Sequence, residues 1–261
     1  MVHWVVGYPT LAETERVVLT LAEAGADLIE LQIPFSDPIA DGPTIRRAND
    51  IARAGGVRVA DSLELLARLR PQIEVPLLFI TYFNILFGYG RGSGPAGGVA
   101  AFCRDAAAAG AFGLIVPDIP VDEQQEGYLA ACQAAGLAPI PVLSPELGRR
   151  GRWARVAEIA RDYGIAQPVP NRFAYCQSVS ATTGSDKAIE YERLADFVRG
   201  CRAYLQVPIG VGFGIRSRQD VERIHRFADF AIVGSQALRT YMEAPAGEKL
   251  PRLREFVRGL R

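Results

Sequence analysis

Short apolar runs alternate with amphipathic segments along the whole of this 261-residue chain, and this alternation limits the folds open to it most strongly. The runs are continuously apolar, as expected for parallel strands that are covered on both faces. The predicted strands are His3–Gly7, Leu28–Ile33, Pro76–Thr81, Gly113–Val116, Ala138–Val142, Arg172–Gln177, Pro208–Val211 and Phe230–Val233. The pattern therefore indicates an α/β protein with a parallel sheet.

The segments between these runs carry helix signals. Apolar residues recur at helical spacing near the C-terminal end, at Leu194, Phe197, Val198 and Cys201 and again at Leu253, Phe256, Val257 and Leu260. Thr10-x-x-Glu13 has the form of a capping box before a first helix. Gly25, Gly110 and Gly136 each stand in an Ala-Gly pair before a strand, as helix-terminating glycines do.

Eight strand-helix units in 261 residues favour a closed barrel over an open sheet. An open doubly wound sheet has about five to seven strands, whereas a (β/α)8 TIM barrel takes eight units in about 250 residues. No composition shift or linker divides the chain, and the Gly-rich stretch 88–98 is interpreted as a loop before a helix. We predict one TIM-barrel domain over residues 1–261.

Charge and cysteine usage exclude several classes of protein. Lys and Arg number 29 and Asp and Glu also number 29, which argues against binding to nucleic acid or to an anionic membrane. We find no signal peptide and no apolar stretch of about 20 residues that would span a membrane. The cysteines lack metal-ligand or disulfide spacing, so we expect buried thiols, no metal site and a cytoplasmic protein. They are Cys103, Cys132, Cys176 and Cys201.

Active sites of such barrels lie at the carboxyl ends of the strands. Glu30 stands inside the second apolar run and shares a face with Leu28 and Gln32, so we expect it in the barrel lumen. Partial desolvation there would raise the pKa of Glu30 and suit acid-base catalysis. The alternative is a structural carboxylate paired with Lys or Arg. Asp41 follows the same strand, and the alternative for it is a turn residue before Gly42-Pro43.

Glycines at the ends of the last strands indicate a phosphate site. Gly212-x-Gly214 follows the seventh run, and Gly234-Ser235 follows the eighth and opens a helix. Loops at these two places, with a helix N-terminus, form the usual phosphate cradle of TIM barrels. Thr182–Ser185 adds hydroxyl groups after the sixth run, consistent with a lid over a phosphorylated ligand.

The stretch from Glu30 to Ile45, which contains Pro-Phe-Ser-Asp-Pro-Ile-Ala-Asp-Gly-Pro, closely resembles the signature of the tryptophan synthase α subunit family. Further matching motifs are Gly7-Tyr8-Pro9, Thr81-Tyr82-Phe83-Asn84, Val116-Pro117-Asp118-Ile119-Pro120, Thr183-Gly184, Gly212-Phe213-Gly214-Ile215 and Val233-Gly234-Ser235. The resemblance implies a lyase of tryptophan biosynthesis that cleaves indole-3-glycerol phosphate to indole and glyceraldehyde 3-phosphate. It implies no cofactor on this chain and a pyridoxal-phosphate β subunit as partner.

The resemblance also assigns site residues. Glu30 matches the family's catalytic glutamate and Asp41 its catalytic aspartate, while Tyr82 and Tyr175 match walls of the indole pocket. Thr183 and Gly184 match the lid segment of the substrate site. Gly184, Phe213, Gly214, Gly234 and Ser235 match the phosphate site. We expect backbone amides to hold the phosphate there without an arginine clamp.

Some positions depart from the family pattern. The family's helix before the first strand has no counterpart here, and His3 stands where an aromatic residue is expected. His3 is either an ordinary surface or core histidine or, if it points inward, a third ionisable group beside the indole. Gln32 replaces a glycine and brings an amide that could hydrogen-bond Glu30. The lid at 180–184 is altered, and the stretch 161–171 is long.

Three functions therefore stay open. The chain is a conventional α subunit that works with a β subunit, a stand-alone lyase that releases indole, or a non-catalytic subunit that activates a β partner. The intact Pro34-Phe35-Ser36-Asp37 segment favours the first, and the altered lid and missing helix favour the second. Retention of both Glu30 and Asp41 argues against the third.

Overall fold

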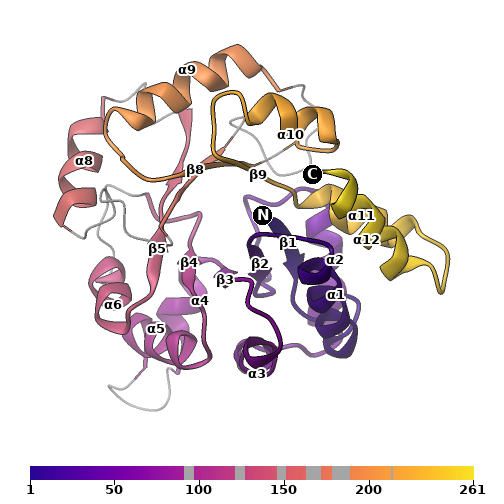
Figure 1. The fold of residues 1–261 in the computed structure, drawn as a ribbon. Coiled ribbons are helices and arrows are strands. Elements are labelled where there is room, and N and C mark those ends of the chain that lie inside the picture. The colour runs from indigo at the N-terminus through magenta and orange to yellow at the C-terminus, as the bar shows by residue number, and fades with distance from the viewer. Residues whose placement is uncertain (91–96, 121–126, 146–150, 163–171, 178–188, 213) are drawn as a thin grey trace.

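Parallel strands form the centre of a computed structural model of the chain, and helices surround them (Figure 1). The structure describes residues 1–261 except 91–96, 121–126, 146–150, 163–171, 178–188 and 213. The described strands are β1 (Val2–Val5), β2 (Ile29–Gln32), β3 (Leu77–Ile80), β4 (Gly113–Ile115), β5 (Ala138–Ile140), β6 (Val142–Leu143), β7 (Ala174–Gln177), β8 (Ile209–Gly212) and β9 (Phe230–Ile232).

The strands close into a barrel. One sheet has the order β1-β2-β3-β4-β5 and the other the order β6-β7-β8-β9, with every pairing parallel. A parallel bridge between Val2 and Val233 joins the last strand to the first. Pro141, which has no N–H to donate, separates β5 from β6 inside the predicted strand Ala138–Val142. The predicted TIM barrel is thus confirmed, with its fifth strand in two pieces.

The described helices lie outside this ring (Figure 1). They are α1 (Leu11–Glu23), α2 (Pro43–Ala54), α3 (Val59–Leu69), α4 (Phe83–Gly88), α5 (Val99–Ala108), α6 (Tyr128–Ala135), α8 (Trp153–Asp162), α9 (Tyr191–Arg202), α10 (Arg218–Ile224), α11 (Ser235–Glu243) and α12 (Lys249–Gly259), with a 3-10 turn at Arg70–Gln72. In the described part of the chain no helix precedes β1. A helix, α5, follows the Gly-rich stretch, as expected.

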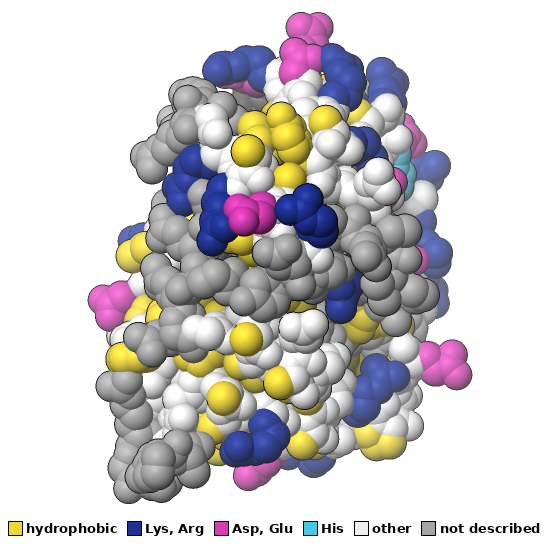
Figure 2. Space-filling model, turned by 90° about the vertical axis from the view of Figure 1, so that its left-hand side faces the viewer, with side chains coloured by type: hydrophobic (Ala, Val, Ile, Leu, Met, Phe, Trp, Pro, Cys, Tyr) yellow, Lys and Arg dark blue, Asp and Glu magenta, His cyan; other side chains and the backbone are white. Residues whose placement is uncertain are grey.

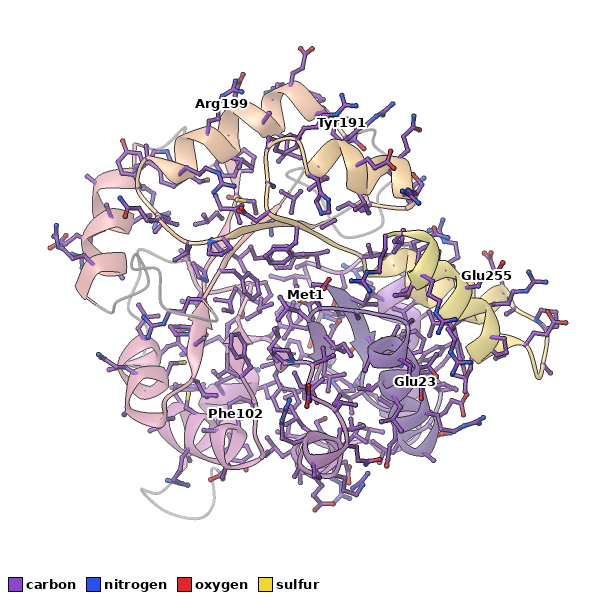
Figure 3. The ribbon with its side chains drawn as sticks, viewed as in Figure 1. Met1, Glu23, Phe102, Tyr191, Arg199 and Glu255 are labelled. Carbon is purple, nitrogen blue, oxygen red and sulfur yellow. The ribbon has the colours of Figure 1, made fainter. Side chains whose placement is uncertain are left out.

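The helical spacing in the sequence marks the faces that pack on the barrel. Leu194, Val198 and Cys201 of α9 are buried, as are Leu253 and Val257 of α12. Burying these side chains removes apolar surface from water, and each Å2 buried stabilises the fold by about 25 cal/mol. This burial is the main force that holds the helices to the sheet. Glu23, Arg199 and Glu255 lie on the outside of the ring in Figure 3, whereas Met1 lies at its centre.

Chain reversals follow the predicted glycines. Gly25, Gly110 and Gly136 have φ angles of 94°, 91° and 73° after α1, α5 and α6. Glycine adopts this left-handed conformation without the steric cost that a Cβ atom imposes. The prediction of three helix-terminating glycines is confirmed.

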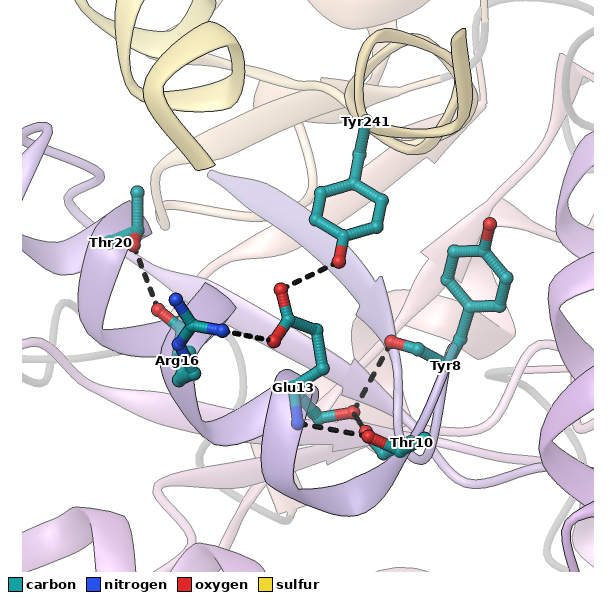
Figure 4. A network of polar contacts seen from close by, with 7 residues as sticks. Tyr8, Thr10, Glu13, Arg16, Thr20 and Tyr241 are labelled. Atoms are coloured by element: carbon teal, nitrogen blue, oxygen red, sulfur yellow. Dashed lines mark hydrogen bonds and ion pairs between the residues drawn. The ribbon is translucent and has the colours of Figure 1, made fainter. Parts of the chain in front are cut away.

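The predicted capping box at the start of α1 is only half formed. The Thr10 hydroxyl accepts a hydrogen bond from the Glu13 N–H at 3.2 Å. The Glu13 carboxylate does not return the bond but accepts from the Tyr241 hydroxyl at 2.7 Å and from Arg16 at 2.8 Å (Figure 4). A tertiary contact between α1 and α11 therefore replaces the second local capping bond.

The cysteines are buried, as the sequence predicts, and they lie in two pairs. Cys103 and Cys132 have their sulfur atoms 3.8 Å apart, and so do Cys176 and Cys201. All four thiols are free. These pairs join segments more than twenty residues apart in the chain, so the spacing in the sequence could not reveal them.

The surface mixes charges of both signs. On the face drawn in Figure 2, basic and acidic side chains alternate with apolar ones among the described residues. This distribution agrees with the equal numbers of basic and acidic residues in the sequence. Among the described residues, every helix is too short or too polar to cross a lipid bilayer.

Candidate functional site

A pocket with about 800 Å3 of empty space opens at the barrel lumen. Its wall includes strand residues from around the ring, namely His3, Glu30, Gln32, Ile80, Ile115, Val142, Tyr175, Gln177 and Ile232. Loop and helix residues complete it, among them Ala40, Asp41, Ile45, Tyr82, Pro117, Gly214, Arg216, Gly234, Ser235 and Arg239. The predicted placement of Glu30 and Gln32 on the lumen face of the second strand is confirmed.

Glu30 is paired with a histidine. Its side chain is 2% exposed, and its Oε1 lies 2.6 Å from Nδ1 of His3, which is itself buried. Among the described residues the partner of this carboxylate is thus an imidazole, and no Lys or Arg is paired with it. Of the two interpretations of His3, the structure supports the inward one, because the ring lines the pocket.

Asp41 is the second buried carboxylate of the pocket. It accepts a hydrogen bond from Gln32 Nε2 at 2.6 Å, and the Tyr82 hydroxyl lies 3.4 Å from the same oxygen. Burial raises the pKa of Asp41, and the bonds from Gln32 and Tyr82 and the nearby His3 partly offset that rise. The Asp41 N–H also donates to the Pro38 carbonyl, so the residue closes a turn and faces the pocket as well.

Gln32 does not form the hydrogen bond that the sequence suggested. The sequence suggested that its amide would hydrogen-bond Glu30, but the amide nitrogen donates to Asp41 instead. The loop after β2 brings Asp41 back to the end of the strand, within hydrogen-bond distance of the Gln32 amide. Gln32 Oε1 is buried and has no hydrogen-bond partner among the described residues.

Two tyrosines form walls of the pocket, as expected. Tyr82 precedes α4, stacks on Phe35 at 5.1 Å between ring centroids and accepts a hydrogen bond from the Ala40 N–H. Its position is fixed by Asp118, which accepts from the N–H of the next residue, Phe83. Tyr175 of β7 is buried and lines the same pocket. Burial and the nearby carboxylates Glu30 and Asp41 raise the pKa of the Tyr175 hydroxyl.

Gly212 has a different purpose from the one predicted. A Cβ atom at this position would lie 2.2 Å from the Tyr175 hydroxyl oxygen, so only glycine lets the ring pass. Gly212 thus makes room for Tyr175, and it is not among the pocket-lining residues. Gly214, with φ of 80°, does line the pocket.

The predicted anion site combines a helix terminus with arginines. Gly234 precedes α11 and Ser235 is its first residue, and both line the pocket, so the positive end of the helix dipole faces the cavity. Arg216 and Arg239 line the same pocket. The expectation that backbone amides hold the phosphate without an arginine clamp stays a prediction, and the two arginines add positive charge to the pocket wall, two residues after Gly214 and four after Ser235.

Some predicted residues cannot be placed. Thr183, Gly184 and Phe213 lie outside the described residues, as do the lid at 180–184 and most of the stretch 161–171. Within the described residues no cluster of three His, Cys, Asp or Glu side chains is arranged to hold a metal ion.

Other contributors were missed at the sequence level. Asn49 of α2 is fully buried and accepts a hydrogen bond from the Phe35 N–H, which ties the loop after β2 to the helix that follows it. Arg216 and Arg239 were missed too. Their positions in the sequence could have indicated them, because both follow predicted barrel strands at the end of the barrel where active sites lie.

Comparison with known proteins decides the family. The family model described as "Tryptophan synthase alpha chain" matches residues 1–258. A protein of that name from Syntrophotalea carbinolica is 40% identical over 261 residues, which is 100% of this chain and 93% of the relative. The chain belongs to the tryptophan synthase alpha chain family. The relative from Desulfotalea psychrophila is 38% identical over 239 residues. The match covers 92% of this chain and 86% of that relative.

Solved structures of the family share the fold. Tryptophan synthase from M. tuberculosis, in its aminoacrylate-bound form, is 33% identical with a TM-score of 0.79 and covers 99% of this chain and 90% of the other. The tryptophan synthase subunit alpha from Legionella pneumophila str. Paris has a TM-score of 0.82 at 28% identity. The match covers 99% of this chain and 89% of the Legionella chain. The chain thus has the fold of the tryptophan synthase alpha chain family.

Proposed function

We propose that this member of the tryptophan synthase alpha chain family is a carbon-carbon lyase that cleaves indole-3-glycerol phosphate to indole and glyceraldehyde 3-phosphate. One observation carries the proposal beyond family membership. The same pocket presents two buried carboxylates, Glu30 and Asp41, and the N-terminus of α11 with two arginines. An indole ring beside the carboxylates and a phosphate at the helix terminus would fill both ends of the pocket.

Glu30 supplies the acid-base chemistry in this proposal. The bond between indole C3 and the side-chain carbinol carbon breaks readily only after C3 is protonated. Glu30 gives its proton to C3, and the ring becomes a cation that draws in the electron pair of the breaking bond. The carbinol O–H returns a proton to Glu30 as its carbon becomes the aldehyde, so protons and electrons balance.

Asp41 stabilises the charge that develops on the ring. Its carboxylate accepts the hydrogen bond of the indole N–H, which is strongest when the ring is cationic. Gln32 and Tyr82 hold the carboxylate in one orientation, so little reorganisation is needed as the charge forms. Tyr82 and Tyr175 enclose the ring with their apolar faces.

The phosphate is assigned to the other end of the pocket. Backbone N–H groups at Gly234, Ser235 and Gly214 would donate hydrogen bonds to the phosphate oxygens, and Arg216 and Arg239 would balance their charge. Thr183, Gly184 and Phe213 remain substrate-binding residues by resemblance. This binding needs no cofactor on the chain.

We further propose a single domain in the cytoplasm that works with a pyridoxal-phosphate β subunit. A large apolar side chain, Ile39, is 68% exposed in the loop after β2, beside the pocket-lining Ala40. A partner that covers Ile39 would contact the loop that carries Asp41. The stand-alone lyase and the non-catalytic subunit are the other outcomes of the test below.

The test measures indole release from indole-3-glycerol phosphate by the purified chain, alone and with a β subunit. We expect cleavage that the β subunit accelerates, and a loss of at least 100-fold in kcat for Glu30→Gln. Glu64→Gln, at an exposed carboxylate on α3, is the matched control and keeps full activity. Equal rates for wild type and Glu30→Gln would remove Glu30 from the mechanism, and no release under any condition would leave only a non-catalytic role.

A further inference from the structure

His3 and Glu30 form a buried pair on neighbouring strands. They occupy paired positions of β1 and β2, and His3 Nδ1 lies 2.6 Å from Glu30 Oε1. The residues are 3% and 2% exposed, so water does not compete for this contact. A distance this short between nitrogen and oxygen requires a shared proton and is typical of a charge-assisted hydrogen bond.

The remaining polar atom of each side chain is available to a ligand. Glu30 Oε2 and His3 Nε2 are buried, and neither has a hydrogen-bond partner among the described residues. Both side chains line the pocket. Buried polar atoms without partners are costly, and at a pocket wall they point to a ligand group that completes them.

The imidazole lies between the two ends of the pocket. The three atoms nearest to a Cβ placed on Gly234 all belong to His3, with Cβ at 3.5 Å, Cγ at 3.7 Å and Cδ2 at 3.8 Å. The His3 side chain therefore packs directly against the residue that precedes α11. The ring contacts Glu30 on one edge and faces the helix terminus on another. Packing alone would be satisfied by an apolar aromatic ring, which could not donate to Glu30.

We propose that His3 is a positioning residue for Glu30 in the cleavage reaction, an inference that rests on the proposed function. The Nδ1–H of His3 donates to Oε1 whether Glu30 is a carboxylate or a carboxylic acid. The proton that Glu30 transfers therefore sits on Oε2. It leaves Oε2 for indole C3 and returns to Oε2 from the carbinol O–H, while the Nδ1 proton stays on His3.

The first test uses two substitutions that separate the donor from the ring. His3→Phe keeps a ring and removes the donor, and His3→Asn places an amide nitrogen close to the position of Nδ1. We expect His3→Phe to lower kcat about 10- to 100-fold with KM changed less than about twofold, since a misplaced catalytic group costs about that much. His3→Asn restores most of kcat. The other histidine, His225 at the exposed end of α10, gives the control His225→Phe with unchanged kcat.

The second measurement does not depend on activity. The chain has two histidines, so 15N spectra of the labelled imidazoles, assigned by His225→Phe, report the tautomer of His3 directly. We expect a proton on Nδ1 and a bare Nε2 in the free protein. A bare Nδ1 with a protonated Nε2 would overturn the proposal, even if His3→Phe failed to fold.

The kinetic outcomes are equally distinct. Wild-type kcat in His3→Phe, or no rescue by His3→Asn in a folded variant, would show that His3 does not position Glu30. In that case wild-type cleavage would still support the proposed function. If wild type itself released no indole, the proposed function would fail, and the tautomer measurement would show separately whether the pair exists as described.

Discussion

Gln32 donates its amide N–H to Asp41 across 2.6 Å, although the two residues are nine positions apart in the chain. The bond ties the end of β2 to the loop that follows it and holds a carboxylate at the pocket wall. Gln32 stands where the resembled family has a glycine. The side chain therefore fills part of the lumen and changes the electrostatics of Asp41.

Replacing Gln32 with Leu should raise the pKa of Asp41 further. A hydrogen bond donated to a carboxylate favours the charged form and lowers its pKa. Without the bond from Gln32, the rise in the pKa of Asp41 that burial causes is offset less. The proposed reaction needs the charged form, so the acid limb of the pH profile of kcat should move to higher pH. Steady-state indole release between pH 4 and 9 measures this. An unchanged limb would mean that Asp41 does not set it.

Replacing Asp41 with Asn should stabilise the protein at neutral pH while it lowers activity. Burial raises the folded-state pKa of Asp41 above the unfolded value of about 3.9, so the buried charge lowers stability as pH rises from the unfolded value, and the full cost is present above the folded-state pKa. We expect a gain of about 1 kcal/mol in the free energy of unfolding at pH 7. The gain should disappear as pH falls below the unfolded value, where both states are protonated.

Urea unfolding of wild type and Asp41→Asn at pH 7 and at pH 3 tests this sign. The exposed Asp50→Asn on α2 is the control, with a change within about 0.5 kcal/mol at both pH values. A lower free energy of unfolding for Asp41→Asn than for wild type at pH 7 would contradict the claim that burying the Asp41 charge costs stability.

Gly212→Ala should disable the pocket without a change at any proposed catalytic group. The added methyl would overlap the hydroxyl oxygen and the nearest ring carbons of Tyr175, so the tyrosine or β8 must move. We expect at least a tenfold loss in kcat/KM for indole release and a lower thermal midpoint. Gly200→Ala is the matched control, because nothing lies within 4 Å of that Cβ position in α9. It should stabilise the helix by about 0.5 to 1 kcal/mol.

Tyr241→Phe should weaken the junction between the first and the penultimate helix. The lost hydroxyl donates to Glu13 at 2.7 Å, and the ring itself stays packed against Trp4 at 5.2 Å between centroids. Arg16 continues to pair with Glu13, so no carboxylate is left without a partner. We expect a loss of about 1 kcal/mol in the free energy of unfolding, measured by urea titration, with kcat unchanged. A loss above about 3 kcal/mol would indicate that the ring moves as well.

Local pattern and chain length were enough to predict the barrel and the lumen face of the second strand. Alternation of apolar runs and amphipathic segments reports the sheet-facing side of each element, which depends only on near neighbours. Glu30 and Asp41 follow from the same logic, because a charged residue within or just after a buried strand stands out. The break at Pro141 was visible as a proline, but the pairing geometry decides where a strand ends.

The sequence by itself determined the fold class, the family and the candidate carboxylates. Only the tertiary structure decided their partners: His3 for Glu30, Gln32 for Asp41, and Tyr175 for the space left by Gly212. The physical reason is that hydrogen bonds and steric contacts act over a few ångströms in space. Which side chains come that close depends on strand register and barrel closure, and these join residues far apart in the chain.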